Sequence, residues 1–461
     1  MRLLPYPLHP LPLGATMATA KTKSPAKASK VAPKGTSPVV RQAVVVGGNR
    51  TPFARSNGAY ANASNSDLLT AALDGLVARF GLAGEQLGEV AGGAVLKHAR
   101  DFNLVREAVL GSALAPETPA FDIQKACDTS LEAAVAISNK IRLGQIDSGI
   151  ACGTDTTSDA PVALNDDLRE VLMDANRAKG PADYVKLVGR LRPSQIIMDI
   201  PKNAEPRTGM AMGEHQAITT AEWDISREAQ DQLAISSHDN LAAAYARGFL
   251  DDLVTPYQGL AQDNNLRPGS TLEKLGSLQV AFGDPETGTM TAANSTPLTD
   301  GAAAVLIATP AWAAARDLPQ LARIVDAESS AVDYVHGHEG LLMAPAYAVP
   351  RMLARNGLTL QDFDIYEIHE AFAGTVLSTL AAWESPEFCT EKLGLDAPLG
   401  SIDMTKLNPV GSSLATGHPF AATGARIVAT AAKQLHENGG GRALISVCAA
   451  GGNGLVMILE A

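Results

Sequence analysis

Two cysteines and two histidines stand where short apolar runs give way to turns or helix starts. Cys127 lies just ahead of an alanine-rich segment in QKACDTSLEAAVAISN, and His369 directly follows the run that ends at Ile368. His418 follows glycine-rich turns, and Cys448 ends an apolar run before AAGGNG. Together they supply a nucleophile, a base to activate it, a second acid/base and donors for an oxyanion. The set therefore predicts a covalent site built on a cysteine nucleophile.

Cys127 is the candidate nucleophile because a helix is expected to begin directly after it. Ser130 and Glu132 suit a helix start, and Gly144 suits its end. Unpaired backbone N–H groups and the helix dipole at that start favour an anion, so we expect a stabilised thiolate. The alternative is a small buried core residue, which is what most isolated cysteines are.

Each of the other three residues also has an ordinary explanation. A histidine at a turn usually caps or bonds locally, and a glycine run after a strand can be a hairpin. His369 stands at a strand end, however, where open α/β sheets bind ligands. Pro419 fits the first position of a helix beyond His418, and the glycines after Cys448 allow close backbone approach to a ligand.

A metal site is not predicted. The pair His336 and His338 lies in a polar loop with no third ligand nearby in the sequence. The four cysteines, at 127, 152, 389 and 448, form no CxxC pair or Cys/His ladder, which also argues against structural zinc and a disulfide framework.

The elements that must position these residues alternate between strands and helices. Apolar runs predict strands at 43–46, 89–96, 148–153, 322–326, 365–368, 443–447 and 455–459. Helical spacing predicts helices at 66–80, 102–114 and 130–143. This alternation favours an α/β fold with a sheet covered on both faces, and the two sheet regions are similar enough in size to suggest a duplicated fold. Gly47-Gly48 is no GxGxxG motif, so dinucleotide binding is weakly supported.

Between about 161 and 296 the composition of the sequence changes. Charged residues become more frequent and strand-like patterns become hard to find. We interpret this stretch as a helical excursion inserted into the first sheet region. It is either a lid over a cleft or, through basic residues among apolar ones, a surface for a membrane or partner subunit. Those basic residues are Arg177, Lys179, Lys186, Arg190 and Arg192. Segment 226–248 is typical of an ordinary solvated helix.

Composition bounds the class of protein. At 461 residues the chain is expected to form two or three domains, and 46% hydrophobic with 19% charged residues describe a soluble globular protein. A net charge of −12 argues against nucleic-acid binding. Unpaired cysteines predict a reducing, cytoplasmic location. No apolar run is long enough for a transmembrane segment. Residues 1–38 form a basic stretch that predicts a disordered tail, without the arginine-rich amphipathic pattern of a targeting peptide.

The motifs CDTS, GTMTAANSTPLTDGAAA, HEAFA, GHPFAATGAR and CAAGGNG occur in the order and spacing of the thiolase family, which this chain resembles over 44–460. The resemblance implies the thiolase fold, with two similar α-β-α-β-α layered halves and an inserted helical loop domain. The expected boundaries are 39–156 completed by 299–319 for the N-terminal half, 157–298 for the loop domain, and 320–461 for the C-terminal half. It also implies a homodimer or homotetramer.

The resemblance assigns a role to each of the four residues. Cys127 would carry the acyl group, and His418 would take its proton. Cys448 would exchange a proton with the acetyl-CoA enolate. His369 and His418 would line the hole for the thioester oxygen of the leaving acetyl-CoA. The backbone N–H groups of Cys127 and Ala450 would stabilise the tetrahedral intermediate.

Coenzyme A would be a co-substrate, with no permanently bound cofactor. The positions that match the family's pantetheine channel are Met212, Phe282, Ala293, Thr296, Ala371 and Phe372.

Departures from the common pattern point to one branch of the family. Many thiolases have asparagine at the position of His369 and glycine at that of Ala450. Histidine there resembles the branch of the mitochondrial trifunctional enzyme β-subunit and its bacterial relatives, which makes a hydratase/dehydrogenase α-chain a possible partner. Leu131 and Glu132 replace residues that are small in many relatives, so the shape of the acyl pocket is left open.

The leading hypothesis is a 3-ketoacyl-CoA thiolase of fatty acid β-oxidation. An acetoacetyl-CoA thiolase working in the synthetic direction would use the same residues. A decarboxylating ketoacyl synthase lacks a second catalytic cysteine, so Cys448 argues against it. An inactive acyl-CoA-binding scaffold would be expected to have lost a catalytic residue, and none is missing.

Overall fold

The computed structural model describes residues 40–461 except positions 197 and 203. The predicted basic tail at 1–38 lies outside these described residues. None of the described helices is both long enough and apolar enough to span a membrane.

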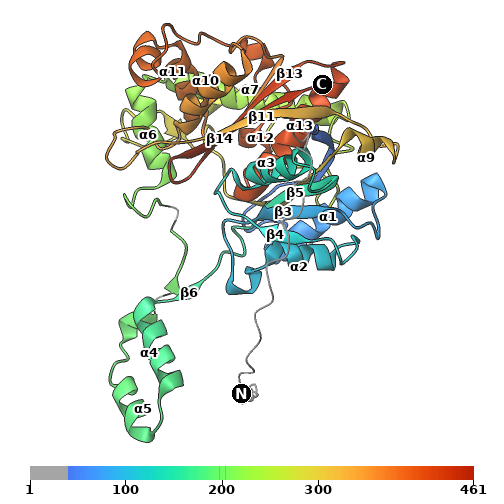
Figure 1. Cartoon of the computed structure of the whole chain (residues 1–461). Helices are drawn as coiled ribbons and strands as arrows, with labels where there is room; N and C mark the ends of the chain where they lie inside the picture. Colours follow the sequence, from blue (N-terminus) through green and yellow to red (C-terminus); the bar gives the residue numbers. More distant parts are fainter. Residues whose placement is uncertain (1–39, 197, 203) are drawn as a thin grey trace, which may run out of the picture. The chain divides into compact units, whose positions relative to one another are not determined.

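The centre of the fold is a ten-stranded sheet whose strands come from both ends of the chain (Figure 1). The first half supplies β1 (Val44–Arg50), β2 (Ala54–Arg55), β3 (Glu89–Gly93), β4 (Ala120–Asp122), β5 (Ser148–Asp155) and β10 (Thr299–Ala308). The second half supplies β11 (Ala322–Ala331), β12 (Ile365–Ile368), β13 (Arg442–Ala449) and β14 (Asn453–Glu460). Their order is β12-β13-β14-β11-β1-β10-β5-β3-β4, with β2 paired to β10.

The strand pairing repeats between the two halves. In the first half, β3 is parallel to β5, and β5–β10 and β10–β1 are antiparallel. In the second half, β12 is parallel to β13, and β13–β14 and β14–β11 are antiparallel. The halves join where β1 pairs with β11 at Val44↔Arg323 and Val45↔Ala322. This repeated pattern agrees with the duplication that the sequence suggested.

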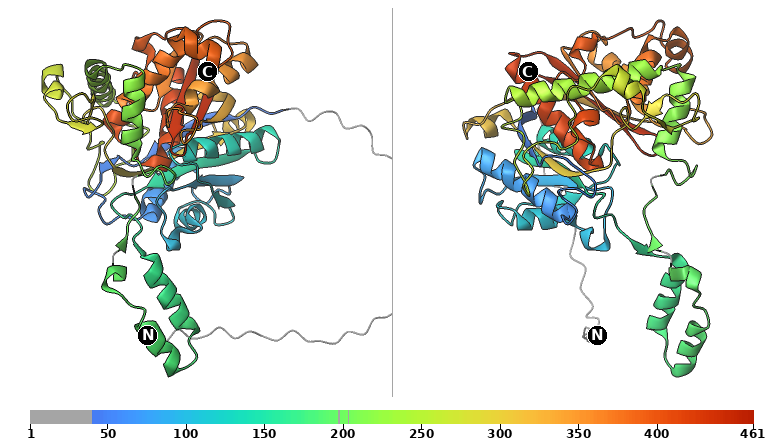
Figure 2. Two further views of the ribbon diagram at one scale, coloured as in Figure 1. Left: turned by 90° about the vertical axis from the view of Figure 1, so that its left-hand side faces the viewer. Right: turned by 180° about the vertical axis from the view of Figure 1, so that it is seen from behind.

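Helices cover both faces of these strands in layers (Figures 1 and 2). The helices of the two halves are α1 (Asn65–Phe80), α2 (Leu104–Gly111), α3 (Thr129–Arg142), α9 (Pro310–Ala314), α10 (Ala344–Asn356), α11 (Ala373–Glu384), α12 (Ser413–Thr416) and α13 (Thr423–Glu437). Helix α1 packs on β1, β5 and β10, and α10 packs on β11, β13 and β14. Helices α3 and α13 contact each other and lie between the two sets of strands. This arrangement agrees with the predicted α/β fold, in which helices cover both faces of a sheet.

The layers follow from side chains that alternate along each strand. On β10, Ala302, Ala304 and Leu306 belong to the core beneath α1, whereas Val305 and Ile307 belong to the central core around α3 and α13. Because both faces of β10 are buried, positions 302–308 form a continuous apolar run in the sequence.

One close contact between helices α3 and α13 also joins the two halves. Gly424 of α13 lies against Leu131 of α3 so tightly that a Cβ there would stand 2.3 Å from the Leu131 backbone nitrogen. Leu131 is fully buried. This contact holds the start of α3, and hence Cys127, beside the segment that carries His418.

The region between the halves contains α4 (Asp166–Arg177), α5 (Pro181–Val188), α6 (Met212–Glu222), α7 (Arg227–Ala246) and α8 (Leu272–Gly276). Two short antiparallel pairs interrupt it: β6 (Ala163–Leu164) with β7 (Met198–Asp199), and β8 (Val280–Phe282) with β9 (Met290–Thr291). These pairs were not predicted, because strands of two or three residues leave no periodic pattern.

Two sequence-based expectations about elements are wrong. Helix α7 is not an ordinary solvated helix, because Asp231, Ser237 and Leu241 are buried and Ser237 donates to Glu370 Oε2 at 2.7 Å. Strand β3 ends at Gly93 rather than at position 96. The amides of Val95 and Leu96 leave the ladder and donate to the carboxylate of Asp155 at 3.0 and 2.8 Å.

Candidate active site

Cys127 lies in a tight turn between β4 and α3. Ala126, just before it, adopts a left-handed backbone with φ of 47°, and the hydroxyl of Thr129 donates to the Ala126 carbonyl at 2.7 Å. The Asp128 amide donates to the Lys125 carbonyl at 2.9 Å. Non-glycine residues seldom adopt this backbone, so the surrounding bonds must hold it in place. The turn sets the Cys127 thiol into the interior, where the residue is 3% exposed.

His418 lies directly against this thiol. Its Nε2 stands 3.1 Å from Cys127 Sγ, and its Nδ1 stands 2.6 Å from Thr423 Oγ1. Its backbone amide donates to Thr299 Oγ1 at 2.8 Å. Pro419 does not open an α-helix as expected, because a 3₁₀ turn at Phe420–Ala422 comes first and α13 begins at Thr423. That turn is what lets Thr423 reach back to the imidazole.

Burial favours the neutral forms of both Cys127 and His418. Desolvation raises the pKa of the Cys127 thiol far above its usual range, and Asp128 raises it further. Desolvation and the charge of Arg426 lower the pKa of His418 to about 3. The backbone N–H groups of Ala450 and Cys127 lower the thiol pKa, but by less than burial raises it. Both shifts favour the neutral forms in the free protein, contrary to the thiolate expected from the helix start.

His369 follows β12 and is buried beside His418, with ring centroids 4.2 Å apart. Its Nδ1 stands 2.7 Å from Ser413 Oγ. Its Nε2 is buried and has no hydrogen-bond partner among the described residues. Burial first, and then His418 and Arg426, hold the pKa of His369 well below its usual range. An imidazole whose Nε2 has no partner among the described residues therefore lies beside Cys127 and His418.

Cys448, near the end of β13, completes the group. It is 3% exposed and belongs to a small apolar cluster that also contains Leu341, Leu342 and Phe372. Burial raises the pKa of its thiol well above the usual range, and charge on Cys127 raises it further. The structure therefore brings all four predicted catalytic residues into one buried site, with two thiols and two neutral imidazoles.

Most of the residues predicted to contact coenzyme A gather next to Cys448. Met212, Phe282, Ala371 and Phe372 belong to the same apolar cluster, and the rings of Phe282 and Phe372 meet edge to face at 6.0 Å. Thr296 lies beside them, where its hydroxyl donates to the Ala371 carbonyl at 3.0 Å.

Ala293, the sixth predicted contact, lines a separate cavity of about 340 Å³ that sequence reasoning missed. Arg55, Arg267 and Lys274 line this cavity as well, together with His238. Converging cations of this kind suit a phosphate or another anionic group. Arg55 and Lys274 are more than 200 positions apart in the sequence, so no local motif could predict that these cations line one cavity.

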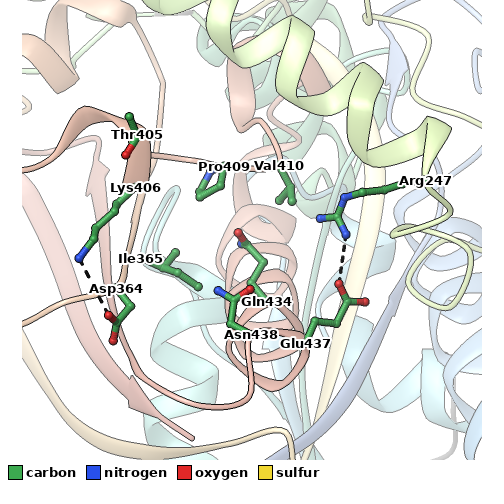
Figure 3. A pocket seen from close by; sticks show the side chains of 10 residues that line it. All are labelled: Arg247, Asp364, Ile365, Thr405, Lys406, Pro409, Val410, Gln434, Glu437 and Asn438. Carbon is green, nitrogen blue, oxygen red and sulfur yellow. Dashed lines mark hydrogen bonds and ion pairs between the residues drawn. The ribbon is translucent and has the colours of Figure 1, made fainter.

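Another polar cavity, of about 350 Å³, contains none of the predicted site residues (Figure 3). Ion pairs Arg247–Glu437 and Lys406–Asp364 stand at its sides at 3.1 and 3.9 Å. Gln434 lines it and donates to Glu367 Oε1 at 2.6 Å. The charged side chains of this cavity are largely paired with each other, so they give no evidence of a ligand-binding site.

One group of side chains has the composition of a metal site. One ligand atom from each of Cys127, His369 and His418 lies within 4.8 Å of the others, and all three residues are buried. A thiolate and two imidazoles suit Zn²⁺. Both histidines, however, are also placed for acid/base and donor roles toward the thiol, so the absence of a metal requirement stays a prediction.

Comparison with known proteins agrees with this geometry. The thiolase N-terminal domain model matches residues 43–311 and the thiolase C-terminal domain model matches residues 318–461. The chain belongs to the thiolase family. It is 40% identical over 423 residues to the 3-ketoacyl-CoA thiolase of Yersinia pestis (strain Pestoides F). The aligned region covers 90% of this chain and 96% of that protein.

Two solved structures share the fold over 92% of this chain. The acetyl-CoA acetyltransferase of Bacillus anthracis aligns over its whole length with a TM-score of 0.76 and 27% identity. The human mitochondrial 3-ketoacyl-CoA thiolase in complex with CoA aligns over 98% of its length with a TM-score of 0.75 and 25% identity.

Proposed function

We propose that this thiolase is a 3-ketoacyl-CoA thiolase, an acyltransferase that uses CoA to cleave a 3-ketoacyl-CoA into acetyl-CoA and a shortened acyl-CoA. The observation that carries the proposal is the contact of 3.1 Å between Cys127 Sγ and His418 Nε2, with the buried Cys448 close enough to Cys127 for the two to interact electrostatically. The 40% identity to 3-ketoacyl-CoA thiolases supports it and favours a place in fatty acid β-oxidation.

In the first half-reaction, His418 Nε2 takes the Cys127 proton as the sulfur attacks the 3-keto carbon. The backbone N–H groups of Cys127 and Ala450 stabilise the resulting oxyanion. The bond between C2 and C3 then breaks, and its electron pair forms the enolate of acetyl-CoA. His369 and protonated His418 donate to the enolate oxygen while Cys448 protonates its carbon. Acetyl-CoA leaves, and the acyl group stays on Cys127.

In the second half-reaction, the Cys448 thiolate takes the proton of the CoA thiol, and the CoA sulfur attacks the acyl-enzyme thioester. Cys127 leaves as a thiolate and regains its proton from His418. All three groups return to their starting states. The neutral resting pair fits this cycle, because burial makes His418 hold the proton only while charge is developing nearby.

We further propose that CoA is the co-substrate and that its pantetheine arm contacts the apolar cluster of Met212, Phe282, Ala371 and Phe372, with Thr296 beside it. Arg55, Arg267 and Lys274, in the cavity that also contains Ala293, would face its phosphates. The presence of a CoA complex among the matching structures supports this assignment, as do the charges of the cavity.

The second candidate function is an acetoacetyl-CoA thiolase that joins two acetyl-CoA molecules. The TM-score of 0.76 to an acetyl-CoA acetyltransferase is as good as that of 0.75 to a 3-ketoacyl-CoA thiolase, so the fold fits both candidates. It would run the first half-reaction backward, with Cys448 removing a proton from acetyl-CoA.

We also propose that the chain has the domain boundaries expected from its sequence, works as a homodimer or homotetramer in the cytoplasm, and can associate with a hydratase/dehydrogenase α-chain. The repeated strand pattern supports the two halves, and four unpaired cysteines support a reducing compartment. We propose Lys186, Arg190 and Arg192 for the α-chain contact. Arg190 pairs with Asp174 at 2.7 Å, so Lys186 and Arg192 are the better candidates.

The test is thiolysis of acetoacetyl-CoA and of 3-ketohexadecanoyl-CoA by purified protein with CoA supplied. Cleavage of the long substrate would support the β-oxidation enzyme, and cleavage of acetoacetyl-CoA alone would favour the second candidate. Cys127→Ala is the control and should cleave neither. If the unmodified protein cleaves neither substrate, both candidates fail and an acyl-CoA-binding scaffold becomes the better explanation.

A further inference from the structure

Ser413 is a buried serine that touches the catalytic histidine pair from behind. It opens α12 and is fully buried. Its Oγ stands 2.7 Å from His369 Nδ1 and 2.8 Å from Arg426 Nη2. Arg426, on α13, is 3% exposed and also reaches Ser412 Oγ at 3.3 Å. A guanidinium, a hydroxyl and an imidazole thus form one buried chain that ends at the active site.

The number of available hydrogens favours one donor in the hydrogen bond between Ser413 and His369. Arginine only donates, so Arg426 occupies a lone pair of Ser413 Oγ. If His369 Nδ1 also donated to Ser413, the serine hydroxyl hydrogen would need a third partner, and the described residues offer none. Burying an unsatisfied donor costs about 1–3 kcal/mol. If the serine donates to Nδ1 instead, Ser413 Oγ is satisfied and the unpaired donor becomes His369 Nε2–H, beside Cys127 and His418, where a substrate oxygen can accept from it.

This direction places the imidazole hydrogen of His369 on Nε2. That nitrogen is buried without a partner among the described residues. His369 also contributes to the group whose ligand atoms lie within 4.8 Å of one another around Cys127 and His418. Since Nδ1 is occupied by Ser413, the free Nε2–H is the donor left for a charge that develops beside the nucleophile.

We propose that Ser413, held by Arg426, is a positioning residue that fixes His369 as the Nε2–H tautomer and aims this hydrogen at the enolate oxygen of the leaving acetyl-CoA. The inference rests on the proposed function, because the enolate arises in carbon–carbon cleavage. A donor fixed before the reaction needs no reorganisation when the charge forms, which is how an oxyanion hole lowers a barrier.

The surrounding charges support the same assignment. Arg426 lowers the pKa of both His369 and His418, although burial contributes more to each. The carboxyl groups of Glu367 and Glu370 lie near the guanidinium and offset its buried charge. Both imidazoles therefore stay neutral at assay pH, so that His418 can accept a proton while His369 donates a hydrogen bond.

The tautomer can be read directly by NMR of protein labelled with ¹⁵N in the histidine rings. The chain has nine histidines, and His369→Asn assigns the resonances of His369 by their loss. We expect unmodified protein to show the Nε2–H tautomer at His369. A resonance pattern of the Nδ1–H tautomer would overturn the proposal without any variant of Ser413 being needed.

The kinetic test uses Ser413→Ala, with Ser412→Ala as the matched control because Ser412 touches Arg426 but not His369. Thiolysis of 3-ketoacyl-CoA should fall about tenfold to a hundredfold in kcat for Ser413→Ala. Exchange of labelled CoA into acetyl-CoA, which transfers the acyl group without an enolate, should stay near that of the unmodified protein. Ser413→Thr keeps the hydroxyl and should restore part of the thiolysis.

The outcomes separate this proposal from the proposed function. Equal loss of exchange and thiolysis in Ser413→Ala would mean a merely structural role and would sink the proposal. Failure of thiolysis in the unmodified protein would remove the proposed function, while the NMR measurement would still decide the tautomer of His369.

Discussion

At the scale of single residues, burial outweighs the local electrostatics of the helix start. Cys127 precedes α3 and has two backbone N–H groups directed at it, yet desolvation dominates its pKa. A helix dipole contributes about 0.3–1 kcal/mol at an exposed end, whereas full burial of a charge shifts a pKa by up to about 3–5 units. We therefore expect Cys127 to rest as a thiol and to become a thiolate only as His418 accepts its proton.

The alkylation rate of Cys127 should reveal this neutral pair. We expect inactivation by iodoacetamide to speed up roughly tenfold per pH unit from pH 6 to pH 9, because the thiolate is the reactive form and the raised pKa keeps it scarce. Mass spectrometry of the labelled peptide would separate Cys127 from the other three cysteines. A rate that levels off near pH 7 would instead indicate a thiolate–imidazolium pair.

The two cysteines should fail at different steps. Cys127→Ser should form no acyl-enzyme with acetyl-CoA, because its hydroxyl is a far weaker nucleophile. Cys448→Ala should still be acetylated by acetyl-CoA but should not cleave a 3-ketoacyl-CoA, since the enolate lacks its acid. Intact-protein mass spectrometry after acetyl-CoA, followed by a thiolysis assay, distinguishes the two. Acetylation that persists in Cys127→Ser would contradict the assignment of the nucleophile.

Glu367 should make stability depend on pH. Burial is the largest cause that raises the pKa of this carboxyl from 4.5 to about 7. Because the folded pKa lies above the unfolded one, the native state binds the extra proton between these values, and stability is lost as pH rises through about 7. At pH 8 the ionised group would cost up to about 3 kcal/mol.

Glu367→Gln should remove this pH dependence while keeping an acceptor for Gln434. At pH 5 we expect the Tm of the variant to be equal to or lower than that of the unmodified protein. At pH 8 we expect it to be higher. Thermal unfolding of both proteins across this range gives the difference. A Tm difference that does not change with pH would show that Glu367 does not titrate there.

At the scale of elements, the active site depends on how closely α3 and α13 approach. Gly424→Ala would bring a Cβ to 2.3 Å from the backbone of Leu131, which cannot swing away as a side-chain tip could. Overpacking of this kind costs about 1–3 kcal/mol. Because α3 follows Cys127, we expect a lower Tm together with slower acetylation of the enzyme. Gly276→Ala, with nothing near its new Cβ, is the matched control.

Two of the strands that the sequence predicted best are buried on both faces. Strand β12 was predicted at its observed bounds and β5 to within two residues, and every residue of both strands is buried. Helix α7 was misjudged since its buried face carries polar residues such as Asp231 and Ser237, whose partners are distant in the chain. Periodicity alone cannot distinguish a satisfied buried polar face from a solvated one.

The sequence predicted the site residues that belong to motifs but missed those defined by contacts between distant segments. The motifs disclosed Cys127, His369, His418 and Cys448, because each follows a recognisable strand or turn. They did not disclose Ser413, whose meaning depends on contacts to His369 and Arg426. Nor could they establish that Cys127 is buried, which depends on the packing of the two halves and raises the pKa of its thiol.

At the scale of the whole molecule, the site needs both halves and the region between them. The first half contributes Cys127, the second contributes His369, His418 and Cys448, and α6 and β8 contribute Met212 and Phe282. Helices α4 and α5 contribute none of these residues. They carry exposed apolar side chains instead, with Val185 72% and Val188 67% exposed.

These two helices can be removed at a natural junction. Strands β6 and β7 pair antiparallel at Ala163↔Asp199 and Leu164↔Met198, so residues 165–197 can be replaced by Asn-Gly, which favours a two-residue hairpin. Thiolysis of acetoacetyl-CoA should stay close to that of the full chain, because no predicted catalytic or CoA contact is lost. Co-purification with a hydratase/dehydrogenase α-chain should disappear.

A second variant separates charge from apolar surface. Replacing Lys186 and Arg192 with alanine in the full chain removes two exposed cations but keeps Val185 and Val188. If the shortened chain loses the α-chain and the double variant retains it, the apolar face carries the association. If the shortened chain loses thiolysis while its Tm is unchanged, α4 and α5 belong to the active site, and their assignment to partner binding is wrong. Retention of the α-chain by the shortened protein would place the contact elsewhere on the molecule.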